Sequence, residues 1–465
     1  MSFKNLLESI LEAGRIISET PGNRYIAVLT HYDADGLSAG GALLRLLEKL
    51  GKKYVIRSVT ELNDNNIKKF FMIKAHLHII ADLGSGELEK ISQYKSSYNV
   101  NKVLIIDHHK ISGDLRDLIL VNPELYGIDG GSADCTAVLS SYIGYKLLKD
   151  PYFTEIGIIG ATGDMQIYEP MDLTLNILEE AISKGVAKHI RDFIFFQNRS
   201  LPIFKAITWT YVPYIPNFSG RDDIGLMLVK KAGIDINKGS GAYTTVDDLS
   251  NYEKNRLLEE ILHYILGLGV DDLKPRDLMS DIIIFTKEEH PLLKYSQDFS
   301  SLVSTAGRLG KDFLGILITS GLRDSLINEL EVLYEERRKL LSKYMSYVEE
   351  NRKIIDNIVI VDLRNMEVPA RFGGTISTLL SRSLIYSDKV ILVLLRNEDA
   401  IKISSRAPKK LVDEGLDLSL VMRDVAKKYG GHGGGHNVAA GASILREDGS
   451  LVNYLVDLIK SYLKR

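Results

Sequence analysis

Short runs of apolar residues alternate with longer helical patterns over the first part of the chain. Three runs, residues 25–30, 77–81 and 103–106, are almost wholly apolar and rich in β-branched side chains. Such runs are typical of strands buried on both faces of a parallel sheet, and the helical patterns between them fit crossover connections. We therefore predict an α/β fold, with a doubly wound parallel sheet formed by residues 1–185.

The alternation is lost in residues 186–320, which predict a mostly helical insert that also completes the first domain. The insert carries an aromatic stretch that includes Trp209, Tyr211 and Tyr214. These aromatic rings either pack within the insert or stack on nucleic-acid bases.

Apolar positions at helical spacing predict a long connecting helix within residues 321–355. Its charged stretch, residues 335–339, is interpreted as a solvated face. An apolar strand at residues 357–363 then opens a smaller α/β domain, residues 356–465.

Acidic and histidine side chains directly follow the apolar runs. They are His31, Asp33 and Asp35 after the first run, Asp82 after the second, Asp107, His108 and His109 after the third, and Asp164 after a later apolar segment. Ligands of doubly wound sheets gather beyond the carboxyl ends of the strands, and carboxylates so close together repel unless a cation lies between them. Oxygen and imidazole ligands suit Mn²⁺, Mg²⁺, Fe²⁺ or Zn²⁺. The alternative is a solvated acidic loop.

The order H-x-D-x-D-G, D-x-G, D-H-H and a later isolated Asp resembles the DHH phosphoesterase superfamily. The resemblance implies two divalent ions, Mn²⁺ or alternatively Mg²⁺, with these ligands: His31, Asp33 and Asp82 for one ion, and Asp35, Asp82, His108 and Asp164 for the other. Asp82 would bridge the ions, Asp107 would orient the histidines, and His109 would stabilise charge on the scissile phosphate. Bacterial members of the RecJ branch tend to carry an acid at the position of His31, and archaeal members look more like this chain.

Residues 400–407 predict a strand that ends in two hydroxyls and a guanidinium, and residues 430–441 are interpreted as glycine-rich turns that direct N–H groups at an anion. Together they resemble the substrate-binding domain that follows the DHH domain in this superfamily. The resemblance implies these substrate contacts: Ser404, Arg406, Gly434, Gly435 and His436.

Residues 299–311 are similar to the A-G-R-L motif of RecJ exonucleases. The similarity implies that Arg308 contacts a phosphate of a single strand. The alternative is a surface arginine on an ordinary helix.

Composition narrows the class of protein. Of the 465 residues, 45% are hydrophobic, enough for sizeable cores, and no apolar run reaches membrane-spanning length. The single Cys135 excludes a disulfide framework and fits a reducing cytosol, so we expect a cytoplasmic protein without membrane partners. Because the net charge is −3, any surface that binds nucleic acid must be a local basic region.

These features predict an archaeal RecJ-like exonuclease that hydrolyses single-stranded DNA, or RNA, with 5′→3′ polarity by family analogy, in replication or repair. One alternative is a phosphodiesterase of short oligoribonucleotides or cyclic dinucleotides. Another is a scaffold subunit of a replicative helicase, although such relatives lose metal ligands. The resemblance also implies the GINS replication complex as a partner.

Overall fold

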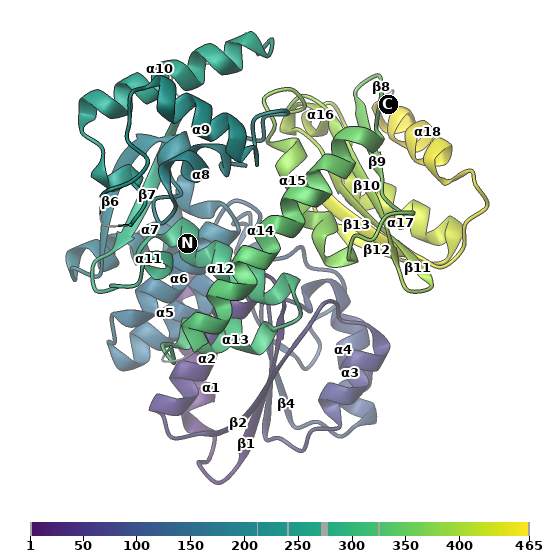
Figure 1. Ribbon diagram of the computed structural model, residues 1–465. Helices are drawn as coiled ribbons and strands as arrows, with labels where there is room; N and C mark the ends of the chain where they lie inside the picture. The colour runs from purple at the N-terminus through teal and green to yellow at the C-terminus, as the bar shows by residue number, and fades with distance from the viewer. Residues whose placement is uncertain (1, 212, 240, 271–277, 324–325, 464–465) are drawn as a thin grey trace. The chain divides into compact units, whose positions relative to one another are not determined.

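The computed structural model describes residues 2–211, 213–239, 241–270, 278–323 and 326–463 (Figure 1). They form two compact units, each built from two separate stretches of chain. The first unit comprises Met1–Asp192 and Ser280–Arg337, and the second comprises Phe193–Met279 and Arg338–Arg465.

The first unit contains a five-stranded sheet in the order β2-β1-β3-β4-β5, and its strands all run parallel. The strands are β1 (Tyr25–His31), β2 (Lys53–Val59), β3 (Leu77–Ala81), β4 (Lys102–Ile106) and β5 (Ile119–Val121). The predicted doubly wound parallel sheet is confirmed, with the three apolar runs as β1, β3 and β4. Because the strand order reverses between β1 and β3, the carboxyl ends of these two strands flank the switch point where such sheets bind ligands.

Helices cover both faces of this sheet (Figure 1). Ala27 and Leu29 face α3 (Asp64–Phe71) and α4 (Leu88–Ser97) on one side. On the other side, Ile26 and Val28 belong to a larger core with most of the remaining helices. These are α1 (Ser2–Glu19), α2 (Ala34–Lys49), α5 (Thr136–Leu148), α6 (Tyr152–Gly163), α7 (Asp172–Ser183), α11 (Pro291–Lys294), α12 (Ser296–Arg308) and α13 (Asp312–Ser320).

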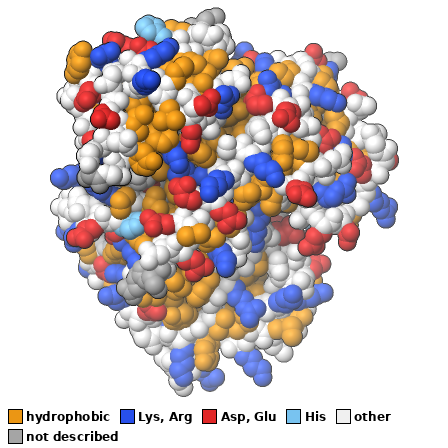
Figure 2. Space-filling view, in the orientation of Figure 1, with side chains coloured by type: hydrophobic (Ala, Val, Ile, Leu, Met, Phe, Trp, Pro, Cys, Tyr) orange, Lys and Arg blue, Asp and Glu red, His pale blue; other side chains and the backbone are white. Residues whose placement is uncertain are grey.

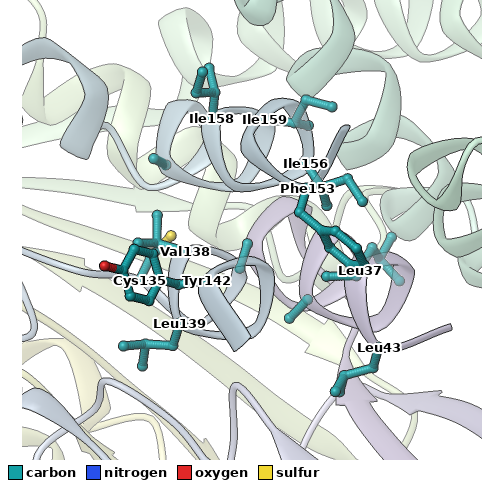
Figure 3. Packing of buried hydrophobic residues seen from close by; sticks show 14 of the residues in the cluster. Leu37, Leu43, Cys135, Val138, Leu139, Tyr142, Phe153, Ile156, Ile158 and Ile159 are labelled. Carbon is teal, nitrogen blue, oxygen red and sulfur yellow. The ribbon is translucent and has the colours of Figure 1, made fainter. Parts of the chain in front are cut away.

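Helices α2, α5 and α6 pack closely, and Figure 3 shows Leu37, Val138 and Phe153 of these helices together in the core. Two glycines permit this approach. A Cβ on Gly144 of α5 would lie 2.2 Å from the Phe153 ring, and a Cβ on Gly160 of α6 would lie 2.2 Å from the Cβ of Ala137. Larger residues at either glycine would therefore force the helices apart.

Short elements complete this part of the chain. They are the 3-10 helices η1 (Ser85–Glu87), η2 (Pro123–Tyr126) and η3 (Gln166–Tyr168), and a two-stranded sheet of β6 (Ala187–Phe193) and β7 (Met279–Phe285). Strand β6 leads into the insert and β7 follows it, so the two ends of the insert are joined by the pairing of these strands.

The insert is mostly helical, as predicted, and has its own hydrophobic core. Its elements are η4 (Ile194–Phe196), α8 (Ile203–Thr208), α9 (Asp222–Lys231), η5 (Val246–Asp248) and α10 (Asn251–Gly267). The side chains of Tyr211 and Tyr214 are buried, with 9% and 2% exposed. Trp209 donates a hydrogen bond to Asp222 and lies beneath the guanidinium of Arg338, whose carbon is 4.4 Å from the ring centre. These contacts favour packing over base stacking.

The predicted smaller C-terminal domain is also present, with a six-stranded mixed sheet in the order β12-β13-β11-β10-β9-β8. The strands are β8 (Arg352–Ile355), β9 (Ile358–Asp362), β10 (Val390–Asn397), β11 (Ala400–Arg406), β12 (Gly431–Gly435) and β13 (Ala439–Ile444). The associated helices are η7 (Ala370–Phe372), α15 (Gly373–Ser381), α16 (Lys409–Asp413), α17 (Leu418–Tyr429) and α18 (Leu451–Leu463). The glycine run interpreted as turns is instead strand β12.

The long predicted helix is α14 (Leu326–Asn351), which is continuous from the first unit into the second. The prediction that its charges form a solvated face is wrong for two residues, because Arg337 and Arg338 are buried. Arg337 donates to the backbone oxygen and hydroxyl of Ser301 and to the hydroxyl of Thr305, and these bonds replace water.

Basic and acidic side chains are interspersed across the face of the molecule in Figure 2, and neither sign covers it. None of the helices in the described residues is both long and apolar enough to cross a bilayer.

Candidate metal centre

The loop after β1 carries the first group of predicted ligands. Asp33 caps helix α2, because its Oδ1 accepts a hydrogen bond from the N–H of Gly36 at 3.0 Å. Its Oδ2 lies 3.0 Å from Nδ1 of His31. Gly36 is required at this turn, since a Cβ there would lie 2.6 Å from the backbone oxygen of His31. The capped turn thus fixes the imidazole and the carboxylate side by side.

Asp82 follows β3 in the left-handed backbone conformation, with φ of 63°. Its two carboxylate oxygens face different neighbours. Oδ2 lies 3.3 Å from Nδ1 of His31, whereas Oδ1 lies 3.4 Å from Nε2 of His108. Asp82 is 1% exposed, so this division of its oxygens takes place in a buried site.

Beyond β4, the Asp107 carboxylate organises the turn that carries both histidines. Its Oδ2 accepts from the N–H of Ser85 at 2.9 Å, and its Oδ1 accepts from the N–H of His108 at 2.8 Å. The same Oδ1 lies 2.8 Å from Nδ1 of His109. The ring of His108 is held differently, because its Nδ1 donates to the backbone oxygen of Gly130 at 2.8 Å. Asp107 therefore orients the ring of His109, whereas the backbone of Gly130 orients the ring of His108.

Asp164 follows helix α6 and joins the same cluster. Nε2 of His108 lies 3.4 Å from Oδ2 of Asp164 and 3.9 Å from Oδ2 of Asp35. Within the described chain, three overlapping groups have ligand atoms within 4.8 Å of one another: His31, Asp33 and Asp82; Asp35, His108 and Asp164; and Asp82, His108 and His109. The structure therefore brings all six predicted ligands together, with His109 beside them.

The electrostatics of this cluster fit a bound cation. Burial, with the neighbouring carboxylates of Asp82 and Asp164, raises the pKa of Asp35 well above its usual range. Burial also raises the pKa of Asp164 to about 6, although His108 opposes this rise. Burial alone would lower the pKa of His108, yet the surrounding carboxylates raise it. Buried acids crowded in this way are stabilised by divalent cations, and carboxylate and imidazole donors suit Mn²⁺ and Mg²⁺.

One segment near the cluster contains functional residues that sequence reasoning missed. The hydroxyl of Thr136 donates to Oδ1 of Asp82 at 3.2 Å, and the N–H groups of Thr136 and Ala137 donate to the two oxygens of Asp35 at 2.9 and 2.7 Å. The side chain of Gln166 links the N–H of Cys135 to the oxygen of Gly130. The sequence did not indicate these residues, because contacts made through the backbone leave no residue-type pattern.

The structure places Arg308 beside the first group of ligands. Its guanidinium donates to the hydroxyl of Tyr32 at 2.6 Å and lies over the Tyr32 ring, 5.0 Å from the ring centre. Burial would raise the pKa of Asp33, but His31 and, to a smaller extent, Arg308 hold it below its usual range. Gly307 allows this packing, because a Cβ there would lie 1.8 Å from the backbone oxygen of Tyr32.

The predicted substrate contacts of the C-terminal domain lie on adjacent strands of the second unit. Ser404 of β11 and Gly434 of β12 both pair with Gly441 of β13, so the three residues form one row on one face. A Cβ on Gly434 would meet nothing within 4 Å, which leaves its backbone accessible on that face. On β11, Arg406 donates to the hydroxyl of Thr378 at 2.9 Å.

Gly435 is the last residue of β12, and His436 follows in the turn that leaves this strand. Gly435 has φ of 131°, a conformation that favours glycine, and the N–H of His436 donates to the backbone oxygen of Ala439 at 2.7 Å. The five predicted contacts are thus neighbours within one domain.

Two family models match the chain. The DHH family, N-terminal domain, matches residues 25–159, and the DHHA1 domain matches residues 372–465. The chain therefore carries a DHH domain and a DHHA1 domain. The DHH match contains the predicted ligands from His31 to His108, and the DHHA1 match contains Ser404, Arg406 and His436.

The chain is 29% identical over 471 residues to an uncharacterized protein of Methanocaldococcus jannaschii, covering 99% of this chain and 96% of the relative. The similarity to this relative therefore extends over almost the whole of both chains.

Several solved structures share the fold of this chain. RecJ of Thermus thermophilus in complex with Mn²⁺ superposes with a TM-score of 0.58 at 14% identity, covering 98% of this chain but only 55% of RecJ. CDC45 from Entamoeba histolytica superposes with a TM-score of 0.62 at 13% identity, covering 99% of this chain and 98% of CDC45. A DHH domain described as that of a member of a family of ribosomal proteins has a TM-score of 0.62 at 16% identity, covering 100% of this chain and 92% of that domain. At these identities the likeness establishes the RecJ-like fold alone.

Proposed function

We propose that this protein is a metal-dependent phosphodiesterase that degrades single-stranded nucleic acid from an end. The observation that carries the proposal is the position of the Asp82 carboxylate between two histidines. One of its oxygens lies 3.3 Å from His31, and the other lies 3.4 Å from His108. A carboxylate placed between two sets of ligands can serve two ions at once, as in two-metal sites that hydrolyse phosphoesters. The proposed ligands are those predicted from the sequence, and Mn²⁺ is the proposed ion.

Divalent ions in such a site generate a nucleophile from water at neutral pH and neutralise charge on the phosphate. The chain's own residues would position the substrate. Asp107 holds His109 through Nδ1, so Nε2 is the ring nitrogen that would donate to a phosphate oxygen. The side chain of His109 is 40% exposed, in contrast to 6% for His108, which favours His109 as the substrate contact. The guanidinium of Arg308 would add a positive charge beside Asp33.

The finer assignments rest on the resemblance to RecJ-like nucleases. We propose DNA as the substrate, with RNA as the alternative, 5′→3′ polarity, and a cytoplasmic role in replication or repair. The GINS replication complex is the proposed protein partner. The nucleotide next to the cleaved bond would be bound by Arg406 and His436, together with Ser404 and the glycines of β12.

Two alternatives differ in what they require. A phosphodiesterase of dinucleotides has no need of an insert with its own core or of Arg308 beside the ligands, both of which this chain has. A scaffold without catalysis would not need six ligand side chains clustered in a buried site. The exonuclease proposal accounts for both observations.

The test is an assay with 5′- and 3′-labelled DNA and RNA oligomers, single- and double-stranded, with Mn²⁺, Mg²⁺ or a chelator. We expect mononucleotides released in sequence from the 5′ end of single strands, only when metal is present. Preferential hydrolysis of dinucleotides would favour the oligoribonuclease alternative, and tight DNA binding without hydrolysis would favour the scaffold.

A further inference from the structure

Thr136, the first residue of helix α5, contacts two carboxylates of the proposed metal centre at once. The residue is fully buried. Its N–H donates to Oδ2 of Asp35 at 2.9 Å, and its hydroxyl donates to Oδ1 of Asp82 at 3.2 Å. Asp35 lies 101 residues away in sequence and Asp82 lies 54 residues away, so these are tertiary contacts rather than local capping.

The two carboxylates are held in different ways. Both oxygens of Asp35 accept backbone N–H groups, from Thr136 and Ala137, and no substitution at position 136 other than proline removes these donors. No backbone N–H of the described residues donates to the Asp82 carboxylate. Within the described chain, the Thr136 hydroxyl is the one group outside the proposed ligands and His109 that donates a hydrogen bond to its carboxylate.

The direction of the Asp82 carboxylate therefore depends on a side-chain hydroxyl. With Oδ1 bonded to Thr136, Oδ2 is directed to His31 at 3.3 Å. Without this bond, the carboxylate would rotate toward whichever imidazole attracts it more strongly.

We propose that Thr136 is a positioning residue whose hydroxyl keeps one oxygen of Asp82 directed at each half of the metal centre. This inference rests on the proposed function, because it assigns Thr136 a role toward ions that Asp82 would bridge. Groups that hold metal ligands from behind typically change metal affinity by about 10- to 100-fold when they are removed.

The test is calorimetric titration of Mn²⁺ into chelator-stripped protein, with the signal of free Mn²⁺ in electron paramagnetic resonance as a second readout. Thr136→Val removes the hydroxyl but keeps the shape and the N–H that anchors Asp35. We expect Mn²⁺ affinity to fall by roughly 10- to 100-fold. Thr136→Ser restores the hydroxyl and should return the affinity to within about threefold of wild type.

Ser140→Ala is the matched control. Ser140 lies one turn further along α5, is also fully buried, and its hydroxyl has no hydrogen-bond partner in the described part of the chain. We expect this variant to bind Mn²⁺ like wild type. A loss of equal size in Ser140→Ala would show that any buried hydroxyl of α5 has the effect, and it would overturn the assignment to Thr136.

The outcomes separate the inference from the function on which it rests. Wild-type affinity in folded Thr136→Val would overturn the role of Thr136 and leave the metal centre standing. Failure of the wild-type protein to bind Mn²⁺ would overturn both. If Thr136→Val does not fold, as judged by its thermal transition without metal, Thr136→Ala replaces it, because alanine removes the hydroxyl without adding bulk.

Discussion

Asp82 occupies a backbone conformation that restricts which substitution can test it. With φ of 63°, alanine would add strain, whereas asparagine tolerates this region and keeps the size of the side chain. We predict that Asp82→Asn folds but loses Mn²⁺ binding and retains less than a few per cent of hydrolytic activity, because a neutral amide cannot bridge two cations. Activity on a labelled oligomer and calorimetry with Mn²⁺ provide the measurements.

Asp356→Asn is the control for this substitution, since Asp356 is also left-handed, with φ of 51°, but belongs to the second unit. It should keep full activity. A folded Asp82→Asn enzyme with near-normal activity would contradict the two-ion mechanism.

A second acid, Asp134, is predicted to make stability depend on pH. Burial raises its pKa to about 7 from the usual 3.8, with the nearby charge of Asp172 adding to the rise and the N–H of Thr174 opposing it. The folded state therefore keeps a proton that the unfolded state releases. Stability from this group is fully present below about pH 4 and is lost as the pH rises toward 7, with a slope of up to about 1.4 kcal/mol per pH unit.

Asp134→Asn should remove this loss. The thermal midpoint of Asp134→Asn minus that of wild type should increase from pH 4 to pH 7.5. Both proteins are measured with a chelator present, so that the other acids titrate equally in the two. Oδ1 of the asparagine can still accept from Thr174, as the carboxylate does at 3.0 Å. A difference that does not change with pH would refute the raised pKa.

The residues of the candidate site differ in how far sequence could predict them. The proposed ligands that follow β1, β3 and β4 could be predicted because acids and histidines that end adjacent parallel strands meet at one edge of the sheet. Asp164 follows helix α6, and it was predicted from the apolar segment before it and the order of the motifs. Thr136 and Gly130 were not, because they contact proposed ligands through a hydroxyl and a backbone oxygen that belong to no motif. Gln166 was not either, because its amide contacts only the backbone of Cys135 and Gly130 among the described residues. A contact between residues 101 positions apart leaves no mark on local pattern.

At the scale of elements, the close contact of α5 and α6 yields a prediction. A methyl group on Gly160 would lie 2.2 Å from the Cβ of Ala137 and 3.0 Å from Oδ1 of Asp35. Gly160→Ala should therefore lower the free energy of unfolding by about 1–3 kcal/mol, as overpacking does, and weaken Mn²⁺ binding by displacing Asp35. Thermal denaturation and calorimetry measure the two effects.

Gly267→Ala provides the comparison, because a Cβ at this exposed position of α10 meets nothing within 4 Å. Alanine favours helix over glycine by about 1 kcal/mol, so this variant should be at least as stable as wild type. Equal behaviour of the two variants would show that Gly160 is not a packing requirement.

Strands and helices could be predicted from the sequence where apolar side chains alternate or recur at helical spacing. They could not be predicted where the sequence lacks such a pattern. Strand β12 consists of glycines around one histidine, so its sequence has no alternation to reveal a strand. It is extended because it pairs with β13 and because α17 packs against it, with the oxygen of Met422 2.1 Å from where a Cβ of Gly433 would be. Arg337 and Arg338 are buried by partners that lie more than thirty residues away in sequence.

At the scale of the whole molecule, the proposed metal ligands belong to the first unit, whereas Arg406 and His436 belong to the second. We predict that Arg406→Ala and His436→Ala bind Mn²⁺ like wild type but raise the KM for a single-stranded oligomer, Arg406→Ala by roughly 10-fold or more for a lost charge-assisted bond. Elemental analysis measures the metal, and steady-state kinetics measure KM.

Arg396→Ala is the control in this domain, because Arg396 is an exposed arginine of β10 and has not been proposed to contact substrate. Its kinetics should match those of wild type. Loss of metal in Arg406→Ala or His436→Ala would contradict the proposed division of roles between the units.

The crowding of buried acids around Asp82 also has a consequence for the protein in a living cell. When divalent ions are scarce, the folded chain has only the nearby histidines to offset this repulsion. Bound ions would stabilise the folded state in proportion to the logarithm of their concentration. Proteases remove the less stable population faster. We therefore expect the abundance of the protein to follow the cell's supply of manganese or magnesium, so that metal starvation lowers the amount of the protein as well as its proposed activity.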